Sequence, residues 1–203
     1  MMVTALEAYG KDKKKVYLDG QFAFVLYKGE LSGCHIEENR ELSEEIYDRI
    51  MGDILWRRIR MRCMNLLKTM DRTEYQLRTK LAQGLYPAEL IDRALEWLKG
   101  LHYLDDARYA ECYLRSQGEK KSRRQLLAEL LQKGVDKELA LEVLDSYEGP
   151  SEEDMIRKLV EKKGIDPEKA SLKERQKLYG FLLRKGFSSA EVSRVLNNFD
   201  EFD

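Results

Sequence analysis

The chain has few of the residues from which metal sites, disulfide frameworks and sharp chain reversals are built. Its 203 residues include three cysteines, three prolines and two histidines. Cys34, Cys63 and Cys112 are far apart and outside any Cys-x-x-Cys spacing, so the sequence indicates neither a disulfide framework nor a zinc site. His35 and His102 lie in different segments, which leaves little material for a histidine-based site. We therefore expect no metal and no cofactor.

Signals for an enzyme or a membrane protein are also missing. No P-loop, GxGxxG, GxSxG or HExxH pattern occurs, so we expect a protein that is not an enzyme and has no catalytic residues. No apolar run approaches the length that spans a bilayer, and the first residues lead into no signal-peptide core. These absences predict a cytoplasmic protein without a membrane partner.

Charge, in contrast, is abundant and unevenly placed. Charged residues make up 36% of the chain, which favours a helix-rich protein, and the formal net charge is −1. Residues 1–53 hold 7 Lys/Arg against 11 Asp/Glu, residues 54–134 hold 17 against 10, and residues 135–203 hold 12 against 16. A basic middle between acidic ends suits a polyanionic or acidic partner, although solvated helix faces account for most individual charges.

The first 35 residues predict β-structure. Asp19-Gly20 between alternating apolar residues is a strong signal for a β-hairpin. Residues 3–9 are a candidate third strand. The alternating residues are Val16, Leu18, Phe22, Phe24 and Leu26. Because an isolated hairpin is barely stable in water, we expect this piece to pack on the helices or on a partner.

A long helical stretch follows, with Ser43 as its expected N-cap. Gly52 lies inside it and predicts a kink or a split. Four arginines lie within six residues of this stretch and form either a phosphate-facing stripe or pairs with nearby acids; they are Arg57, Arg58, Arg60 and Arg62.

The rest of the chain repeats one pattern three times. Each copy has a helix that begins at a Ser or Thr with Gln or Glu three residues on, the spacing of a capping box, and ends at a glycine. The glycines, Gly84, Gly134 and Gly186, are 50 and 52 residues apart. Two apolar residues lie seven and three positions before each glycine. These pairs are Leu77 and Leu81, Leu127 and Leu131, and Tyr179 and Leu183.

Another helix precedes each glycine-ended helix, and a short amphipathic helix follows it. We therefore predict a mostly α-helical fold, an elongated curved array of three tandem three-helix repeats with a small N-terminal β-hairpin or meander. The expected boundaries are a β-rich extension at 1–42 and repeats at 43–100, 101–149 and 150–203.

A second basic cluster stands at the entry of the capped helix of repeat two, and consists of Lys120, Lys121, Arg123 and Arg124. Cations at a helix N-terminus run against the helix dipole, which makes the cluster a candidate partner contact. A solvated turn is the equally weighted alternative. Just before it, an apolar plug of Leu101, Tyr103 and Leu104 is expected to lead into Asp105-Asp106, which caps a helix in preference to holding a metal.

The residue pattern of this region resembles that of a known family. Tyr103-Leu-Asp-Asp-Ala-Arg-Tyr-Ala110 and the segment 122–135 are similar to the RecX family of recombination regulators, and 72–81 is similar to that family's first-repeat helix. The motif residues that carry the resemblance are Tyr103, Leu104, Asp105, Asp106, Arg108 and Tyr109.

The resemblance implies a monomeric regulator whose partner is the RecA protein filament and which contacts DNA weakly or through that filament. Such a protein lodges in the helical groove of the filament and suppresses ATP hydrolysis, strand exchange and coprotease activity. The two basic clusters are then the expected contact residues. A helical-repeat protein that binds single- or double-stranded DNA directly is the alternative, and the net charge of −1 argues against it as the main activity.

Overall fold

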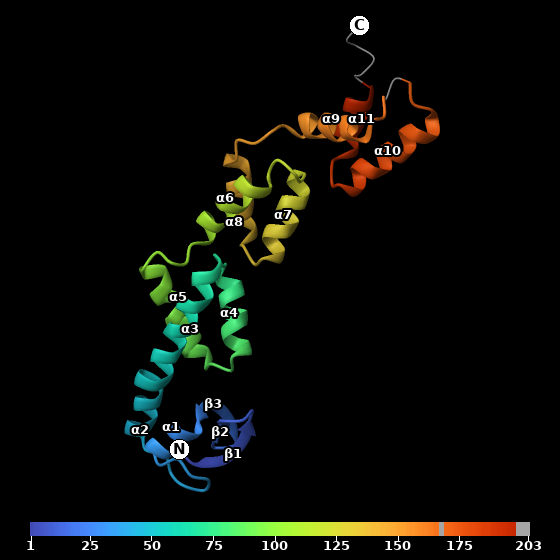
Figure 1. Ribbon diagram of the computed structural model, residues 1–203. Helices are drawn as coiled ribbons and strands as arrows, with labels where there is room; N and C mark the ends of the chain where they lie inside the picture. The colour runs from blue at the N-terminus through green and yellow to red at the C-terminus, as the bar shows by residue number, and fades with distance from the viewer. Residues whose placement is uncertain (167–168, 198–203) are drawn as a thin grey trace. The chain divides into compact units, whose positions relative to one another are not determined.

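The computed structural model describes residues 1–166 and 169–197, and within them three strands are followed by a series of helices (Figure 1). The chain divides into two compact units, Met1–Asp105 and the part that begins at Asp106. The first unit holds the sheet and the first repeat. The second holds the other two repeats.

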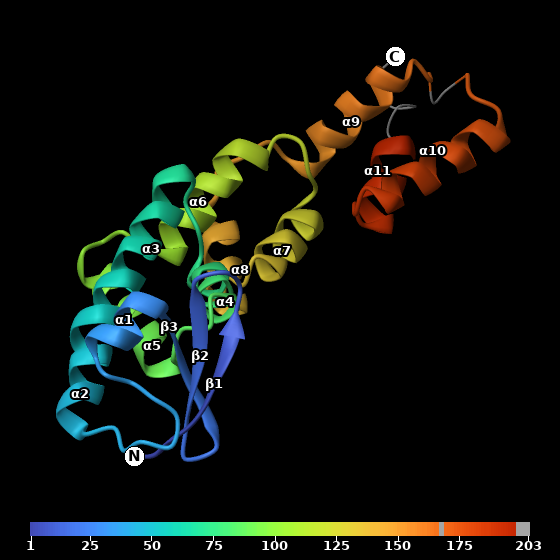
Figure 2. The ribbon, with the colours of Figure 1, turned by 60° about the horizontal axis from the view of Figure 1, so that its bottom comes forward.

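The three strands form one antiparallel sheet in the order β1-β2-β3, as Figure 2 shows. β1 is Val3–Tyr9, β2 is Lys13–Leu18 and β3 is Gln21–Tyr27. Asp19 and Gly20 both have positive φ, 48° and 85°, the conformation of a tight hairpin turn. Both the hairpin and its third strand are therefore confirmed. A short helix, α1 (Lys28–Gly33), follows the sheet.

One side chain of the sheet lies on an unexpected face. Simple alternation puts Phe22 on the same face as Phe24, but the register shifts between Val16 and Tyr17 so that Val16 pairs with Phe24 and Tyr17 with Phe22. Ala23 is the extra residue in this irregularity. A β-bulge of this kind re-aims a side chain, and Phe22 is 39% exposed beside the ring of Tyr17.

The long helical stretch is continuous but not uniform. α2 (Glu44–Arg49) is capped by Ser43, whose Oγ accepts the Ile46 N–H at 3.3 Å, as predicted. It passes into a π-helical segment, η1 (Ile50–Leu55), and then into α3 (Trp56–Thr69). Gly52 therefore lies in a stretch of wider helix and not at a break.

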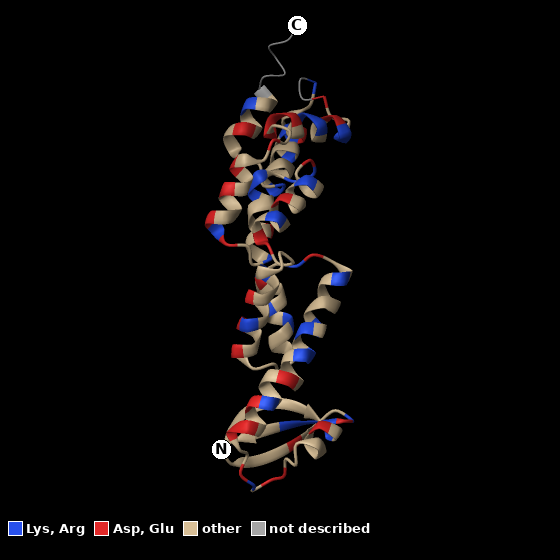
Figure 3. Cartoon of the chain, turned by 90° about the vertical axis from the view of Figure 1, so that its left-hand side faces the viewer, with Lys and Arg blue, Asp and Glu red and all other residues tan. Residues whose placement is uncertain are grey.

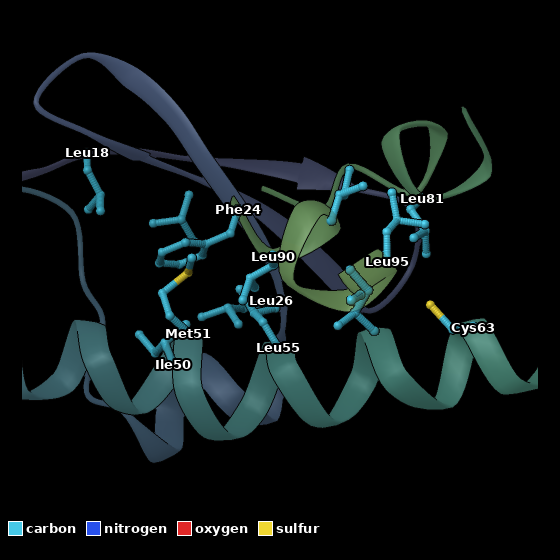
Figure 4. Close-up of a cluster of buried hydrophobic side chains, with 14 of the residues drawn as sticks. Leu18, Phe24, Leu26, Ile50, Met51, Leu55, Cys63, Leu81, Leu90 and Leu95 are labelled. Atoms are coloured by element: carbon cyan, nitrogen blue, oxygen red, sulfur yellow. The ribbon is translucent and has the colours of Figure 1, made fainter. Parts of the chain in front are cut away.

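The sheet packs its inner face on this helix. Phe24 and Leu26 point toward Ile50, Met51 and Leu55 in Figure 4, and all five are buried in one cluster that extends into repeat one. Burial of these apolar side chains supplies the stability that a three-stranded sheet of this size lacks in water.

Three repeats of three helices make up the rest of the described chain. Repeat one is α3, α4 (Glu74–Gln83) and α5 (Ala88–Gly100); repeat two is α6 (Asp106–Gln117), α7 (Arg123–Gln132) and α8 (Lys137–Ser146). Repeat three is α9 (Glu152–Lys163), α10 (Leu172–Arg184) and α11 (Ser189–Asn197). The hydroxyls of Thr73, Ser122 and Ser171 cap the middle helices, as predicted.

The repeat register differs by one residue from the prediction. The left-handed residue after the middle helix is Leu85 (φ 58°) in repeat one, whereas Gly84 has φ −78°. In repeats two and three it is Gly134 and Gly186. Counted from these left-handed residues, the fully buried pair lies eight and four positions earlier in every copy. The pairs are Leu77 and Leu81, Leu126 and Leu130, and Leu178 and Leu182.

The predicted pairs of repeats two and three are therefore wrong. Leu131 and Leu183 are 39% and 38% exposed, and Leu127 and Tyr179 are only partly buried. Aligning the three copies on their glycines shifts repeat one by one residue, because in that repeat a leucine occupies the left-handed position. The apolar plug is also mostly wrong: Leu104 is buried, but Leu101 and Tyr103 are 47% and 51% exposed.

Candidate partner-binding surfaces

The four arginines of α3 do not form one stripe. Arg58 and Arg60 are both engaged within the first unit, on different sides of the helix. Arg58 donates to the Val25 carbonyl at 2.9 Å, forms an ion pair with Glu30 and lies over the Tyr27 ring at 4.8 Å. Its guanidinium therefore ties α3 to the edge strand β3 and to α1.

Arg60 lies against the two tryptophans of the chain. Its guanidinium carbon is 5.3 Å from the centroid of a Trp56 ring and 5.8 Å from that of Trp97, and the two indoles meet edge to face at 6.1 Å. Arg93 lies over Trp56 at 4.1 Å. Cation–π contacts of this kind stabilise an aromatic pair at the edge of a core. The sequence signal for Arg93, three positions after Leu90 on α5, was too general to single it out.

The remaining two arginines of α3 are available to a partner. Arg57 and Arg62 are exposed, and neither forms an ion pair with any residue that the structure describes. Of the two alternatives for this cluster, pairing with an acid is confirmed for Arg58 only, and a phosphate-facing role stays a prediction for Arg57 and Arg62.

The basic cluster before α7 divides in the same way. Lys121 Nζ lies 2.6 Å from Glu129 Oε2 and 3.2 Å from the Tyr113 hydroxyl. Arg123 donates to the Leu144 carbonyl at 2.7 Å and forms an ion pair with Asp145. These two side chains connect the helices of repeat two.

Lys120, Arg123 and Arg124 are exposed, and of these only Arg123 forms an ion pair with a residue that the structure describes. Lys120 Nζ reaches the Ser116 carbonyl at 3.4 Å, a long contact, and the Arg124 side chain faces a hollow that Leu127 and Glu191 also line. Lys and Arg are spread over many elements of both units, as Figure 3 shows, so position and pairing decide which can meet a partner.

Ser122 has a second role that its capping pattern did not reveal. It is completely buried, and its Oγ both accepts the Gln125 N–H at 3.3 Å and donates to the Lys185 carbonyl at 2.9 Å. A Cβ at Gly186 would lie 2.6 Å from this oxygen. Ser122 therefore joins the start of α7 to the end of α10, repeat two to repeat three.

A carboxyl pair stands beside this junction. Glu152 Oε1 accepts the Arg123 backbone N–H at 2.7 Å. Burial, followed by a hydrogen bond with Glu191, raises the pKa of Glu152 to about 7. The Ser188 hydroxyl, in contrast, donates to Glu191 and lowers the pKa of that carboxyl. Of the two carboxyls, Glu152 is therefore the one that keeps its proton to higher pH.

The residues of the family motif surround the start of α6. Leu104 is buried in the core of the first unit, Asp105 directly precedes α6, and Asp106 is in its first turn, whereas a cap from Asp105 stays a prediction. Tyr109 packs against the core of repeat two, whereas Tyr103 and Arg108 are exposed. Most of the motif therefore has a place in the architecture of the repeat.

Among the residues that the structure describes, no helix is long and apolar enough to cross a membrane.

Comparisons with known proteins match the three repeats in order. Models of the first, second and third three-helix domains of RecX match residues 60–98, 105–144 and 151–196. Two solved structures share the fold. One, described as regulatory protein RecX, is 24% identical with a TM-score of 0.65 over 97% of this chain and 98% of the other. RecX from Lactobacillus salivarius is 22% identical with a TM-score of 0.60 over 72% of this chain and 97% of the other.

Curated relatives match over nearly the full length. The regulatory protein RecX of Caldanaerobacter subterraneus subsp. tengcongensis is 32% identical over 97% of this chain and 99% of its own. That of Clostridium perfringens (strain 13 / Type A) is 29% identical over 97% of each. With three matched domains in sequence and relatives of this similarity, the chain belongs to the RecX family of regulatory proteins.

Proposed function

We propose that this protein is a negative regulator of RecA that binds the RecA–DNA filament in its helical groove and inhibits ATP hydrolysis, strand exchange and coprotease activity. The observation that carries the proposal is the match of all three helical repeats, in order, to the domains of RecX. The curated relatives are named regulatory proteins, which favours a binding role over a catalytic one.

Exposed cations on separate repeats are the contacts that we propose for this role. Arg57 and Arg62 are on α3, and Lys120 and Arg124 flank the start of α7. Contacts distributed over two repeats act together on a repeating partner, because the second contact forms at a high effective concentration. Binding through exposed cations weakens as salt increases.

The proposal is tested by titrating the protein into RecA that hydrolyses ATP on single-stranded DNA. We expect inhibition at amounts well below one molecule per RecA protomer, since one bound regulator affects several protomers. Unchanged hydrolysis at several-fold excess over RecA would contradict the proposal.

Two double variants then locate the contacts. Arg57→Gln with Arg62→Gln, and Lys120→Gln with Arg124→Gln, are each expected to weaken inhibition several-fold while helicity is unchanged. Lys137→Gln with Lys173→Gln is the matched control, since it removes the same charge from exposed positions outside both clusters. Lys121 and Arg123 are left intact because they hold repeat two together.

Direct binding of DNA by the helical repeats is the second candidate function. The same exposed cations favour it. It predicts tight, steeply salt-dependent binding of DNA without RecA that both double variants abolish. If the protein inhibits RecA while its repeats bind DNA only weakly, binding to the RecA–DNA filament is favoured over direct binding to DNA.

A further inference from the structure

The outer face of the N-terminal sheet carries aromatic rings and lysines in register. Val16, Phe24 and Leu26 are buried in the core, and neighbouring side chains along a strand point to opposite faces. Strand pairing aligns the outward residues across the sheet, Tyr9 with Lys13 and Tyr27, Glu7 with Lys15 and Val25, and Tyr17 with Phe22. Of these, Val25 is buried beside Tyr86. We call the following residues the sheet face: Tyr9, Lys13, Lys15, Tyr17, Phe22 and Tyr27.

These side chains are held in place by contacts with one another. Lys13 Nζ lies 5.0 Å from the centroid of the Tyr27 ring, and Lys15 Nζ lies 5.5 Å from that of Tyr9. The rings of Tyr17 and Phe22 meet edge to face at 5.9 Å. The Tyr17 hydroxyl donates to Glu7 Oε2 at 2.8 Å. The rings are therefore ordered before any partner arrives.

The rings are nevertheless partly open to solvent, although Arg58 also lies over that of Tyr27. Tyr9, Phe22 and Tyr27 are 38%, 39% and 41% exposed, and Phe22 reaches this face only through the register shift opposite Tyr17. On this face Phe22 lacks the favourable free energy that burial on the inner face would provide. β-Bulges often re-aim a side chain next to a functional site.

Charge on this side of the sheet favours an anionic partner. Lys13 and Lys15 on β2 outnumber Glu7, the acidic residue paired with Lys15 on β1. β2 is the blue strand in the middle of the sheet in Figure 3. The exposed apolar surface consists of flat rings without exposed Leu, Ile or Val, a surface suited to planar ligands.

We propose that the sheet face binds single-stranded DNA. Bases stack on the rings of Tyr9 and Phe22, while Lys13 and Lys15 contact the phosphates. The outer strands are about 10 Å apart, and sheet domains that bind single strands stack two or three bases in this manner. This site meets the helical basic clusters only where Arg58 lies over Tyr27, and it does not depend on RecA.

The test is the affinity for a fluorescently labelled fifteen-residue oligo-dT, measured by anisotropy without RecA. Phe22→Leu and Tyr9→Leu keep an apolar side chain but remove the ring, and each is expected to weaken binding by about 5- to 150-fold. Tyr9→Phe should bind as the original protein does, since stacking needs the ring and not the hydroxyl. Tyr75→Leu is the matched control, an exposed tyrosine on α4 outside the sheet face.

A second arm separates the lysines from the rings. Lys13→Gln with Lys15→Gln is expected to weaken binding and to reduce its salt dependence, whereas Lys137→Gln with Lys173→Gln has little effect. Circular dichroism checks that each variant keeps its helices. A duplex of the same length should bind more weakly, because its bases are already stacked.

Three results would overturn the proposal: unchanged oligo-dT affinity in both leucine variants, affinity that depends on the lysines alone, or equal affinity for duplex. If the leucine variants bind oligo-dT normally and lose only inhibition of RecA, the sheet face contacts protein instead. Failure of RecA inhibition in the unmodified protein, with intact oligo-dT binding, would overturn the proposed function and leave this site standing.

Discussion

At the scale of single residues, the least expected feature is the carboxyl pair of Glu152 and Glu191. The two glutamates are 39 residues apart in sequence, so their contact cannot be predicted from the sequence. One is the first residue of α9, and the other is in the first turn of α11. The pair titrates near neutral pH because Glu152 is partly buried and already hydrogen-bonded to its neighbour.

This pair predicts a pH dependence of stability. The pKa of Glu152 is about 7 in the folded chain and about 4.3 in an unfolded one, so the folded state holds a proton that the unfolded state releases. The free energy of unfolding due to this group therefore falls as pH rises from about 4.3 to about 7. The lowered pKa of Glu191 acts in the opposite sense, and only at lower pH.

We expect Glu152→Gln to flatten this dependence. Glutamine keeps an acceptor for the Arg123 N–H and carries no charge, so the variant should unfold a few degrees above the unmodified protein at pH 8. Near pH 4.5 the two should unfold together. Thermal unfolding followed by circular dichroism across this range is the measurement. Glu161→Gln, a substitution at an exposed position of the same helix, should show the same dependence of stability on pH as the unmodified protein.

The arginines show why part of the candidate surface could not be read from the sequence. Arg57 and Arg58 are neighbours with the same chemistry, yet only Arg58 finds Val25 and Glu30. Those partners come from a strand and a helix that fold back on α3 from about 30 positions away. A pattern of charges gives the cluster, and tertiary packing alone decides which members stay exposed.

At the scale of elements, local signals were reliable where they act locally. The capping serines and threonine and the Asp19-Gly20 turn lay where predicted, because each depends on a few adjacent residues. Signals that depend on tertiary packing were less reliable. Which leucine pair enters each core, and the register shift that turns Phe22 outward, depend on partners elsewhere in the fold.

Gly52 is expected to tolerate an alanine. It lies within η1, has no positive φ, and a Cβ there would meet nothing within 4 Å. Gly52→Ala should therefore raise the free energy of unfolding by about 0.5–1 kcal/mol, because alanine loses less backbone freedom on folding. Urea unfolding measures the change.

Gly186→Ala is the opposing case. Its φ is +87°, and the added Cβ would lie 2.6 Å from Ser122 Oγ, so this substitution should destabilise the second unit by more than 1 kcal/mol. A loss of stability in Gly52→Ala of similar size would mean that the π-helical turn requires glycine.

At the scale of the whole molecule, the buried side chains of the described residues form three clusters with no shared members. One joins the sheet to repeat one, and the other two belong to repeats two and three. Repeats that share little core unfold with some independence, because stability is a sum of local terms and neighbour terms. Both tryptophans, Trp56 and Trp97, pack against the first cluster. Their fluorescence therefore reports on one unit while circular dichroism reports on all helices.

Leu182→Ala tests whether the repeats unfold independently, because the two probes report on different parts of the molecule. Leu182 is fully buried in the repeat-three cluster, and its truncation should destabilise that repeat by about 2–5 kcal/mol. We expect the circular dichroism transition in urea to broaden toward lower concentration, while the midpoint of tryptophan fluorescence is unchanged. Leu95→Ala, in the first cluster, should lower the fluorescence midpoint instead. If Leu182→Ala moves both probes equally, the protein unfolds as a single cooperative unit, and contacts such as that of Ser122 with the Lys185 carbonyl couple the repeats more strongly than their separate cores suggest.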